Sequence, residues 1–456
     1  MKISKTAIQS KTHSQPTICF QDQKLTSYAG ATLLQLLFKQ LDLKTKLSRC
    51  FRPLRASQAY THATITLLLI VHSLLGYRRL QDTRYYENDP MILHLLGLHV
   101  LPDCSTISRR LAQMNTASVD QLRSLTRTLV IDGLVEQSLR RITLDFDGSV
   151  VSTGRYAEGT AVGFNRKNKG QRSYYPLLCT IAQTGQVLDV WHRPGNVHDS
   201  NGAKTFIISC IKAVNAAIPK AVIEVRMDSA FFSEAIVDTL ANAGIEFSIS
   251  VPFARYAALK NIIEQRQRWR HLNEHSAYFE SRWKPNCWAQ RYRFVMLRQY
   301  SKVQHKAPVQ LDLFTPYHFQ QTFKVIITNK TLSAKKLLNY HNGRGYQENL
   351  FAELKTQVQM DYVPTRKLAA NQVYLLATLI AHNLNRAMQM RVNKPVRHTT
   401  EKRTPLWLFE KMDSIRRKLL QQAGRLTNPK GVFTLTMNAN TSVENDFLHY
   451  MSALAS

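Results

Sequence analysis

The chain has 456 residues, with 61 Lys and Arg against 31 Asp and Glu, which gives a formal net charge of +30 at pH 7. Because 44% of its residues are hydrophobic and 9% aromatic, it has enough apolar surface to fold, which excludes a disordered basic tail. A folded protein of this charge repels itself unless a polyanion neutralises it, so nucleic acid is the first expected partner and an anionic membrane surface the second.

Neither membrane insertion nor export is expected. The longest apolar run covers residues 63–76 and includes His72, which is short of the ~20 apolar residues that a membrane span needs. The first five residues are polar and lead into no apolar core, so we expect a cytoplasmic, nucleoid-associated protein. The six cysteines include no C-x2-C pair, which favours reduced thiols over a zinc site or a disulfide framework.

Residues 1–140 are predicted to be mostly helical. Helical apolar spacing covers 33–41 and 63–76, and a further helix starts with Asp89 as its N-cap and Pro90 in the first helical position. The next short helix carries Arg109 and Arg110 on its exposed side. A short turn before such a helix suits a helix-turn-helix DNA reader, and a plain structural bundle is the alternative.

From residue 141 the apolar period changes from helical to two. In the strand that ends at Gly148, one face takes Ile142, Leu144 and Phe146, and the other takes Thr143, Asp145 and Asp147. A hairpin of 176–182 and 186–191 follows. Next come a helix capped by Asp199 or Ser200, a strand over 222–228, a helix over 232–243 and a strand over 247–251. The order β-β-β-α-β-α-β indicates an α/β domain.

The remaining chain is irregular and basic. Residues 255–330 mix a basic helix with strands at 292–297 and 323–328, and helical spacing then resumes near 332 and continues to about 422. Residues 251–310 contain 12 basic and 3 acidic residues, and residues 391–430 contain 11 basic and 3 acidic ones. These two stretches are the predicted electrostatic footprint, with a solvated face as the alternative.

Three acids stand out in a chain with few of them. Asp147 and Asp228 each end a predicted strand, and Glu348 lies on a predicted helix. Taken singly, Asp147 is also a turn residue, Asp228 a helix N-cap, and Glu348 an i,i+4 partner of Arg344. Two strand-end aspartates followed by a helical Glu are more specific, because carboxylate oxygens are the ligands that Mg²⁺ prefers.

The sequence around Glu348 resembles the bacterial insertion-sequence DDE transposases that carry Y-x2-R-x3-E-x6-K around their catalytic Glu. Arg344, Glu348 and Lys355 match the R, E and K of that signature. The tyrosine position falls on His341, with Tyr340 beside it, so the role of the tyrosine stays open.

Two further positions match the aspartates of this family. Asp147, followed by Gly148 and Ser149, resembles its Asp-Gly-Thr-like strand end, and Asp228 matches its second Asp. Asp145 points to the same side of the strand as Asp147 and is the alternative first Asp. The long interval between Asp228 and Glu348 leaves room for the β-rich insertion of this group, and the resemblance spans about residues 100–390.

The resemblance implies an RNase H-like mixed sheet with a β-rich insertion. The expected parts are a helical DNA-binding domain over 1–140, a catalytic domain over 141–254 and 331–390, the insertion over 255–330, and a basic C-terminal region with helices over 391–456. The last region is expected to dimerise or contact DNA.

The resemblance also implies the chemistry. Asp147, Asp228 and Glu348 would hold two Mg²⁺ or Mn²⁺ ions for phosphoryl transfer, and Arg344 and Lys355 would hold phosphates. The implied partners are double-stranded DNA, as terminal inverted repeats and target DNA, and a second copy of the chain.

An aromatic residue in the insertion stacks on a flipped base in relatives that form a hairpin intermediate. Trp283 and Trp288 are the candidates here, with packing inside a small β-subdomain as the alternative. His198 is either close to the site or an ordinary loop histidine. Two rival functions remain at this point, a non-catalytic DNA-binding protein derived from a transposase and an RNase H-like nuclease without strand transfer.

Overall fold

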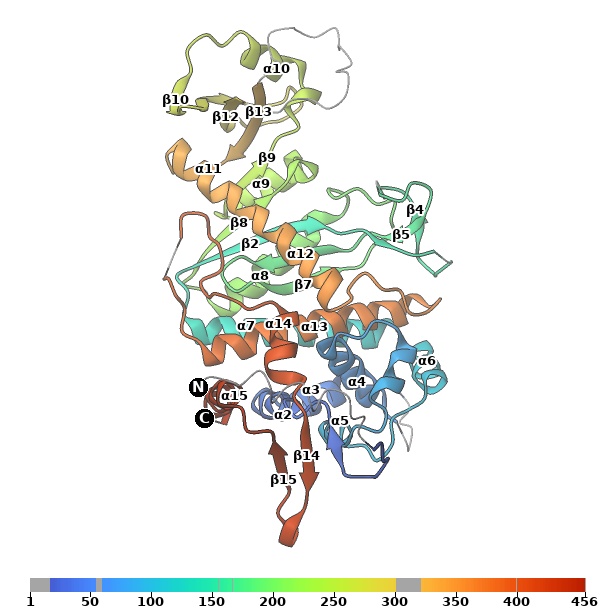
Figure 1. Ribbon diagram of the computed structural model, residues 1–456. Coiled ribbons are helices and arrows are strands. Elements are labelled where there is room, and N and C mark those ends of the chain that lie inside the picture. The colour runs from blue at the N-terminus through green and yellow to red at the C-terminus, as the bar shows by residue number, and fades with distance from the viewer. Residues whose placement is uncertain are drawn as a thin grey trace.

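The computed structural model describes residues 17–54, 60–154, 156–165, 167–300, 321–398 and 400–455. These residues form an elongated molecule, with a large sheet above a group of helices and a hairpin projecting from the lower end (Figure 1). Among the described residues, no helix has the length and apolar character needed to cross a membrane.

The N-terminal part is helical, as predicted. Its helices are α2 (Ala31–Gln40), α3 (Leu43–Cys50), α4 (His62–Leu75), α5 (Pro90–Leu96), α6 (Cys104–Ala112) and α7 (Thr116–Gln137). The Asp89 carboxylate accepts hydrogen bonds from the first-turn amides of Met91 and Ile92, which confirms the predicted start of α5. The long helix α7 was not predicted, although Asn115 caps it in the same way.

The centre of the molecule is a nine-stranded mixed sheet with the order β10-β11-β12-β13-β9-β8-β2-β6-β7. The strands predicted from the period of two are present as β2 (Arg141–Gly148), β6 (Leu177–Ile181), β7 (Gln186–Trp191), β8 (Val222–Met227) and β9 (Glu246–Ser250). β2 runs parallel to β8, and β8 runs parallel to β9. The carboxyl ends of these three strands therefore lie at the same edge of the sheet.

The predicted insertion extends this sheet. It contributes α10 (Ala257–Glu264), β10 (Arg270–Asn273), β11 (Ser276–Trp283), β12 (Tyr292–Tyr300) and β13 (Gln321–Thr328). β13 pairs antiparallel with β9, so the hydrogen bonding continues from the central strands into the insertion. The part of the predicted basic stretch at 301–310 lies outside the described residues.

Two small sheets were not predicted. One is formed by β3 (Val151–Ser152), β4 (Ala161–Val162) and β5 (Arg172–Tyr174). The other pairs β1 (Leu25–Thr26) with the hairpin of β14 (Gly424–Thr427) and β15 (Thr434–Met437). The N-terminal part is therefore not entirely helical, because its first described strand pairs with the C-terminal region.

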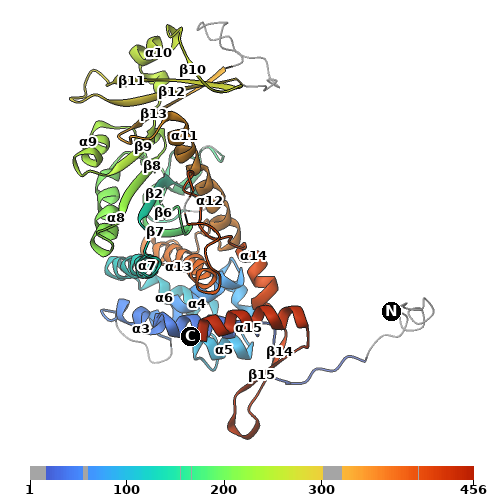
Figure 2. The same cartoon turned by 90° about the vertical axis from the view of Figure 1, so that its left-hand side faces the viewer.

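Helices cover both faces of the large sheet (Figure 2). α8 (Ala203–Ala217) and α9 (Glu234–Asn242) lie on one face, and α11 (Ala334–Asn342) and α12 (Tyr346–Gln357) lie on the other. α13 (Leu368–Val392) is buried along almost its whole length and packs against α4 and α7. The C-terminal region adds α14 (Met412–Ile415), a π-helical turn at Arg416–Leu420 and α15 (Thr441–Ala455), and helical spacing with interruptions had been predicted to about 422.

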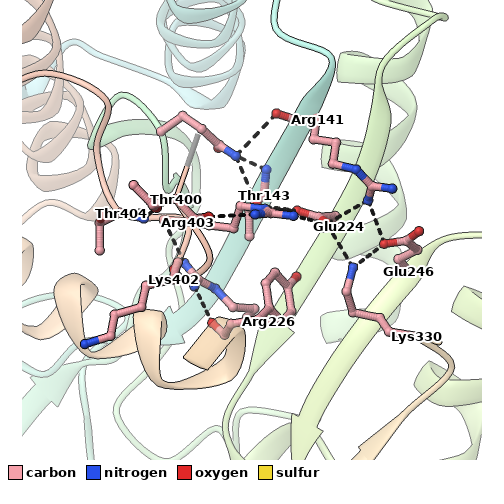
Figure 3. Close-up of polar contacts among 12 residues, drawn as sticks. Arg141, Thr143, Glu224, Arg226, Glu246, Lys330, Thr400, Lys402, Arg403 and Thr404 are labelled. Carbon is pink, nitrogen blue, oxygen red and sulfur yellow. Dashed lines mark hydrogen bonds and ion pairs between the residues drawn. The ribbon is translucent and has the colours of Figure 1, made fainter. Parts of the chain in front are cut away.

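A buried group of charges lies at the amino ends of β2 and β8 (Figure 3). The fully buried Glu224 carboxylate lies 2.8 Å from Arg141 Nη1, 2.9 Å from Lys330 Nζ and 2.9 Å from Arg403 Nε. Burial alone would raise the pKa of Glu224, but the hydrogen bonds and charges of Arg403 and Lys330 lower this pKa to about 2. Glu224 thus pairs with three cations from distant parts of the chain, and two of them, Arg141 and Lys330, also pair with Glu246.

A second buried ion pair continues this network toward α11. Arg226 donates from Nε and Nη2 to the two carboxylate oxygens of Asp145, at 2.6 and 2.7 Å. Its Nη1 donates to the carbonyl oxygens of Tyr340 and Lys402, both at 2.7 Å. A Cβ atom at Gly343 would lie 1.7 Å from that Lys402 oxygen, so glycine is required where this loop meets the segment before α12.

We predict that Glu224→Gln destabilises the protein strongly. It leaves Arg403 without the Glu224 carboxylate, and among the described residues it leaves Arg141 and Lys330 paired with Glu246 alone. Removing one partner of a buried ion pair costs about 3–5 kcal/mol. Urea unfolding followed by circular dichroism measures this loss. The matched control is Glu280→Gln, which removes an exposed partner of Arg293 and should cost about 0–1 kcal/mol. Equal losses in the two variants would contradict the structural role given to Glu224.

Candidate active site

Asp147 and Asp228 lie side by side at one edge of the large sheet. The parallel register pairs Phe146 with Met227, and each aspartate is the next residue of its strand. The Asp147 carboxylate accepts a hydrogen bond from the Gly148 amide at 2.8 Å. The Asp228 carboxylate accepts one from the Ala230 amide at 2.9 Å and caps a short 3-10 turn. The N-cap interpretation of Asp228 is confirmed, and it is compatible with a position in the site.

A hollow of about 870 Å³ opens beyond these strand ends. Its wall includes Asp228 and Asp199, with His198 beside them. Four basic side chains line the same hollow, namely Arg78, Lys167, Arg255 and Lys355. Acidic groups at the strand ends are therefore surrounded by cations from four separate segments of the chain.

The pair of aspartates is electrostatically unfavourable. Burial and the neighbouring charge of Asp228 raise the pKa of Asp147 to about 7, although the Arg344 guanidinium opposes this rise. Burial likewise raises the pKa of Asp228, against the effect of Arg344. Arg344 Nη1 lies 3.0 Å from Asp147 Oδ2, so it acts as the internal counter-ion of the pair.

Sequence reasoning missed the role of Asp199. It was predicted to cap a helix, but α8 starts only at Ala203, after Gly202 at a φ of +69°. Asp199 instead accepts hydrogen bonds from Tyr175 Oη at 2.8 Å and from Arg193 Nη2 at 3.2 Å. Its charge also raises the pKa of Asp147.

Arg344 does not lie on the helix that carries Glu348 and Lys355, although their spacing suggests a common helix. Arg344 lies in a 3-10 turn at Gly343–Gly345, directly before α12. Its partner is Asp147, so the predicted i,i+4 pair with Glu348 is wrong. Glu348 is exposed, and its side chain makes no hydrogen bond or ion pair with any other described residue. It precedes Phe351 and Lys355 of the hollow by one and two turns, which places all three on one face of α12.

The alternative first aspartate has a structural role. Asp145 is only 2% exposed, and both its oxygens are held by Arg226. The candidates for the tyrosine position are also buried. His341 lies 2.9 Å from the hydroxyl oxygens of both Ser248 and Ser250, and the Tyr340 ring lies under Lys330, 4.5 Å from its ammonium.

The remaining predicted DNA-binding residues lie apart from the carboxylates. Trp288 is 5% exposed and stacks on Phe232, while Trp283 is half-buried with its ring edge-on to Phe294. Both rings pack against the core in this arrangement. On α6, Arg109 is exposed and Arg110 is half-buried.

The site was tested for its fit to a divalent cation. Within the described ranges, no three His, Cys, Asp or Glu side chains are close enough together to hold a metal ion. Asp147 and Asp228 nevertheless fit such an ion in chemistry, because a bound cation would relieve the repulsion that raises the pKa of both carboxyl groups. Two of the three predicted ligands are thus adjacent, and Glu348 is not in contact with them.

We predict that Gly148→Ala disrupts the site. The added Cβ would lie 2.4 Å from Tyr175 Cζ and 2.6 Å from Asp199 Oδ1, so both side chains must move. Overpacking of this kind costs about 1–3 kcal/mol, measurable by thermal unfolding. Gly133→Ala is the control, because nothing lies within 4 Å of its Cβ position in α7, and it should be neutral or stabilising. A neutral Gly148→Ala would contradict the close approach.

We predict that Asp147→Asn stabilises the protein in buffer with a chelator. The pKa of Asp147 is raised from 3.8 to about 7, so ionisation of this group lowers the stability of the folded state as pH rises. The advantage of the variant should grow between pH 3.8 and about pH 7 and then stay constant, at on the order of 4 kcal/mol. Melting temperatures across this range measure it. Asp120→Asn, on the exposed surface of α7, should show no such trend.

Comparison with known proteins identifies the family. The family model described as "Transposase DDE domain group 1" matches residues 9–456, and no curated protein matches the chain. A solved piggyBac transposase synaptic complex with hairpin DNA is similar at 10% identity and a TM-score of 0.43, covering 86% of this chain and 80% of that one.

A Mos1 transposase paired-end complex with the left transposon end matches at 14% identity and a TM-score of 0.19. That match covers 44% of this chain and 61% of the Mos1 chain. The family therefore rests on the sequence model, which confirms the predicted resemblance to DDE transposases. Since that model spans nearly the whole chain, the protein belongs to the DDE transposase family, in domain group 1.

Proposed function

We propose that the protein is a DNA transposase that cuts at the ends of a bacterial insertion sequence and joins them to target DNA. One observation carries the proposal: Asp147 and Asp228 form a half-buried like-charge pair at the carboxyl ends of β2 and β8, beside a hollow with basic walls that Asp228 lines. Its membership of the DDE transposase family supports the same reaction.

Asp147 and Asp228 would hold Mg²⁺ or Mn²⁺, and Glu348 would join them as the third ligand of a two-ion site. Bound there, the two ions supply activation of water or of a DNA 3′-OH and stabilisation of the leaving oxygen. This part of the proposal is supported by the raised pKa of both aspartates, since a cation favours their ionised forms. Arg344 already supplies one positive charge at Asp147.

The cations of the hollow would bind and orient the DNA backbone. Lys355 lines the hollow from α12, and burial lowers its pKa, so a neighbouring phosphate would favour its charged form. Arg344 is held over the strand ends by Asp147 and can reach a phosphate from there. Both residues thus position the phosphodiester against the carboxylates.

The basic regions would bind the rest of the DNA. We propose that the N-terminal helices read the terminal inverted repeats and that the insertion and the 391–456 region hold flanking and target phosphates. The net charge of +30 supports an extended DNA footprint. A homodimer would then pair the two ends of the element.

We predict that Asp147→Asn, Asp228→Asn and Glu348→Gln each abolish strand transfer while DNA binding stays near normal. Removal of one carboxylate leaves the charge of the DNA-binding surfaces intact but takes a ligand from the ion site. A labelled duplex from the DNA flanking the gene, with a pre-cut 3′-OH, reports strand transfer with Mg²⁺, and a filter assay reports binding.

Glu280→Gln is the matched control and should retain strand transfer, because Glu280 is exposed in the insertion and pairs with Arg293, away from the carboxylates. Strand transfer by Glu348→Gln at the unmutated rate would overturn the assignment of the third ligand. Cleavage without joining by the unmutated protein would favour a nuclease, and binding without either reaction would favour a non-catalytic DNA-binding protein.

A further inference from the structure

A second hollow adjoins the one that contains Asp228. Its wall includes Arg79 and, from α6, Cys104 and Ser108. Three residues line both hollows, so the two meet at Arg78, Ser152 and Asp361. In Figure 1, α4 and α6 lie below β4 and β5, and the meeting point joins these two parts of the molecule. A continuous surface therefore leads from the carboxylates to α6.

Arg78 is held in place by its backbone. It follows α4, which ends at Gly76 with a φ of +91°, a value that suits glycine at a helix C-terminus. The Arg78 carbonyl oxygen accepts a hydrogen bond from Tyr374 Oη of the buried helix α13, at 3.2 Å. The N-terminal helical part thus delivers this arginine to the hollow from a fixed position.

The Arg78 side chain uses only part of its hydrogen-bonding capacity. Its Nη1 lies 2.6 Å from Asp361 Oδ1 and 2.9 Å from Gln359 Oε1, and the guanidinium lies over the Tyr362 ring. Within the described residues Nε and Nη2 make no hydrogen bond. These two nitrogens form the edge of a guanidinium that binds two oxygens of one phosphate. The side chain is 42% exposed, so this edge is accessible.

We propose that Arg78 binds a backbone phosphate of the DNA strand that runs from the carboxylate pair toward α6. Asp361 holds the guanidinium in its binding orientation when DNA is absent and competes with the phosphate for its charge. This inference rests on the proposed function, because it takes DNA as the occupant of the hollow. It makes the N-terminal helical part a direct contributor to the active site.

The test compares two variants that break the same ion pair. Arg78→Ala removes a phosphate contact, so the plot of log binding constant against log salt concentration should become shallower by about 0.9. Asp361→Asn removes the competing anion and should leave binding to the same duplex unchanged or tighter. The probe is a labelled duplex made from the DNA that flanks the gene. Lys336→Ala is the matched control for the lost charge, because Lys336 is exposed on α11, outside both hollows and outside the regions proposed to bind DNA.

A purely structural ion pair predicts something else, namely equal weakening of DNA binding in Arg78→Ala and Asp361→Asn. That outcome, or an unchanged salt slope in Arg78→Ala, would overturn the proposal. Arg78→Lys keeps the charge and should restore the slope but not the affinity, which separates a phosphate contact from misfolding. Binding is measured with a chelator, so a change in slope stands even if strand transfer is never observed and the proposed function fails.

Discussion

The interaction on which the site depends is the buried ionic network around Glu224 and Asp145, at and behind the strands that carry the carboxylates. It joins β2 and β8 to the turn at Lys330, to the loop at Lys402 and Arg403, and to the last residues of α11. Buried ion pairs add little net stability compared with apolar packing, but losing one partner is costly, so they favour a single arrangement. The segment before α12 is held in place by this network, and Arg344 reaches Asp147 from there.

This network also gives different roles to two acidic residues of β2, Asp145 and Asp147. Asp145 and Asp147 point to the same side of the strand, and the sequence alone does not separate them. Asp145 meets the fully buried Arg226 and stays inside the sheet. Asp147, two residues closer to the strand end, lies beside Asp228, which lines the hollow. A shift of two residues along β2 therefore separates a structural carboxylate from a candidate catalytic one.

Local pattern was sufficient to predict the elements that are buried on both faces of the sheet. The alternation at Ile142, Leu144 and Phe146 predicted β2. The aspartates at the ends of two predicted strands predicted the pair of Asp147 and Asp228. The pattern was insufficient where partners are distant. The sequence predicted Asp199 to be a helix cap. Its partners, Tyr175 and Arg193, come into contact with it only in the folded protein. The strands β3 to β5 are too short to show an alternation of apolar and polar residues. The pairing of β13 with β9 joins residues that are 76 or more positions apart, so local sequence does not reveal it.

The pairing of β1 with β14 has a consequence for how the chain folds during synthesis. Leu25 pairs with Arg425, and the Ala29 amide donates to the Gln422 carbonyl oxygen at 2.9 Å. A Cβ atom at Gly30 would lie 1.9 Å from the Leu419 oxygen, so the first helix begins against backbone from this late segment. On the ribosome, the N-terminal helices emerge long before their partner does. They therefore complete their packing only after almost the whole chain has been translated, so the fold of the N-terminal helices depends on an intact C-terminal region.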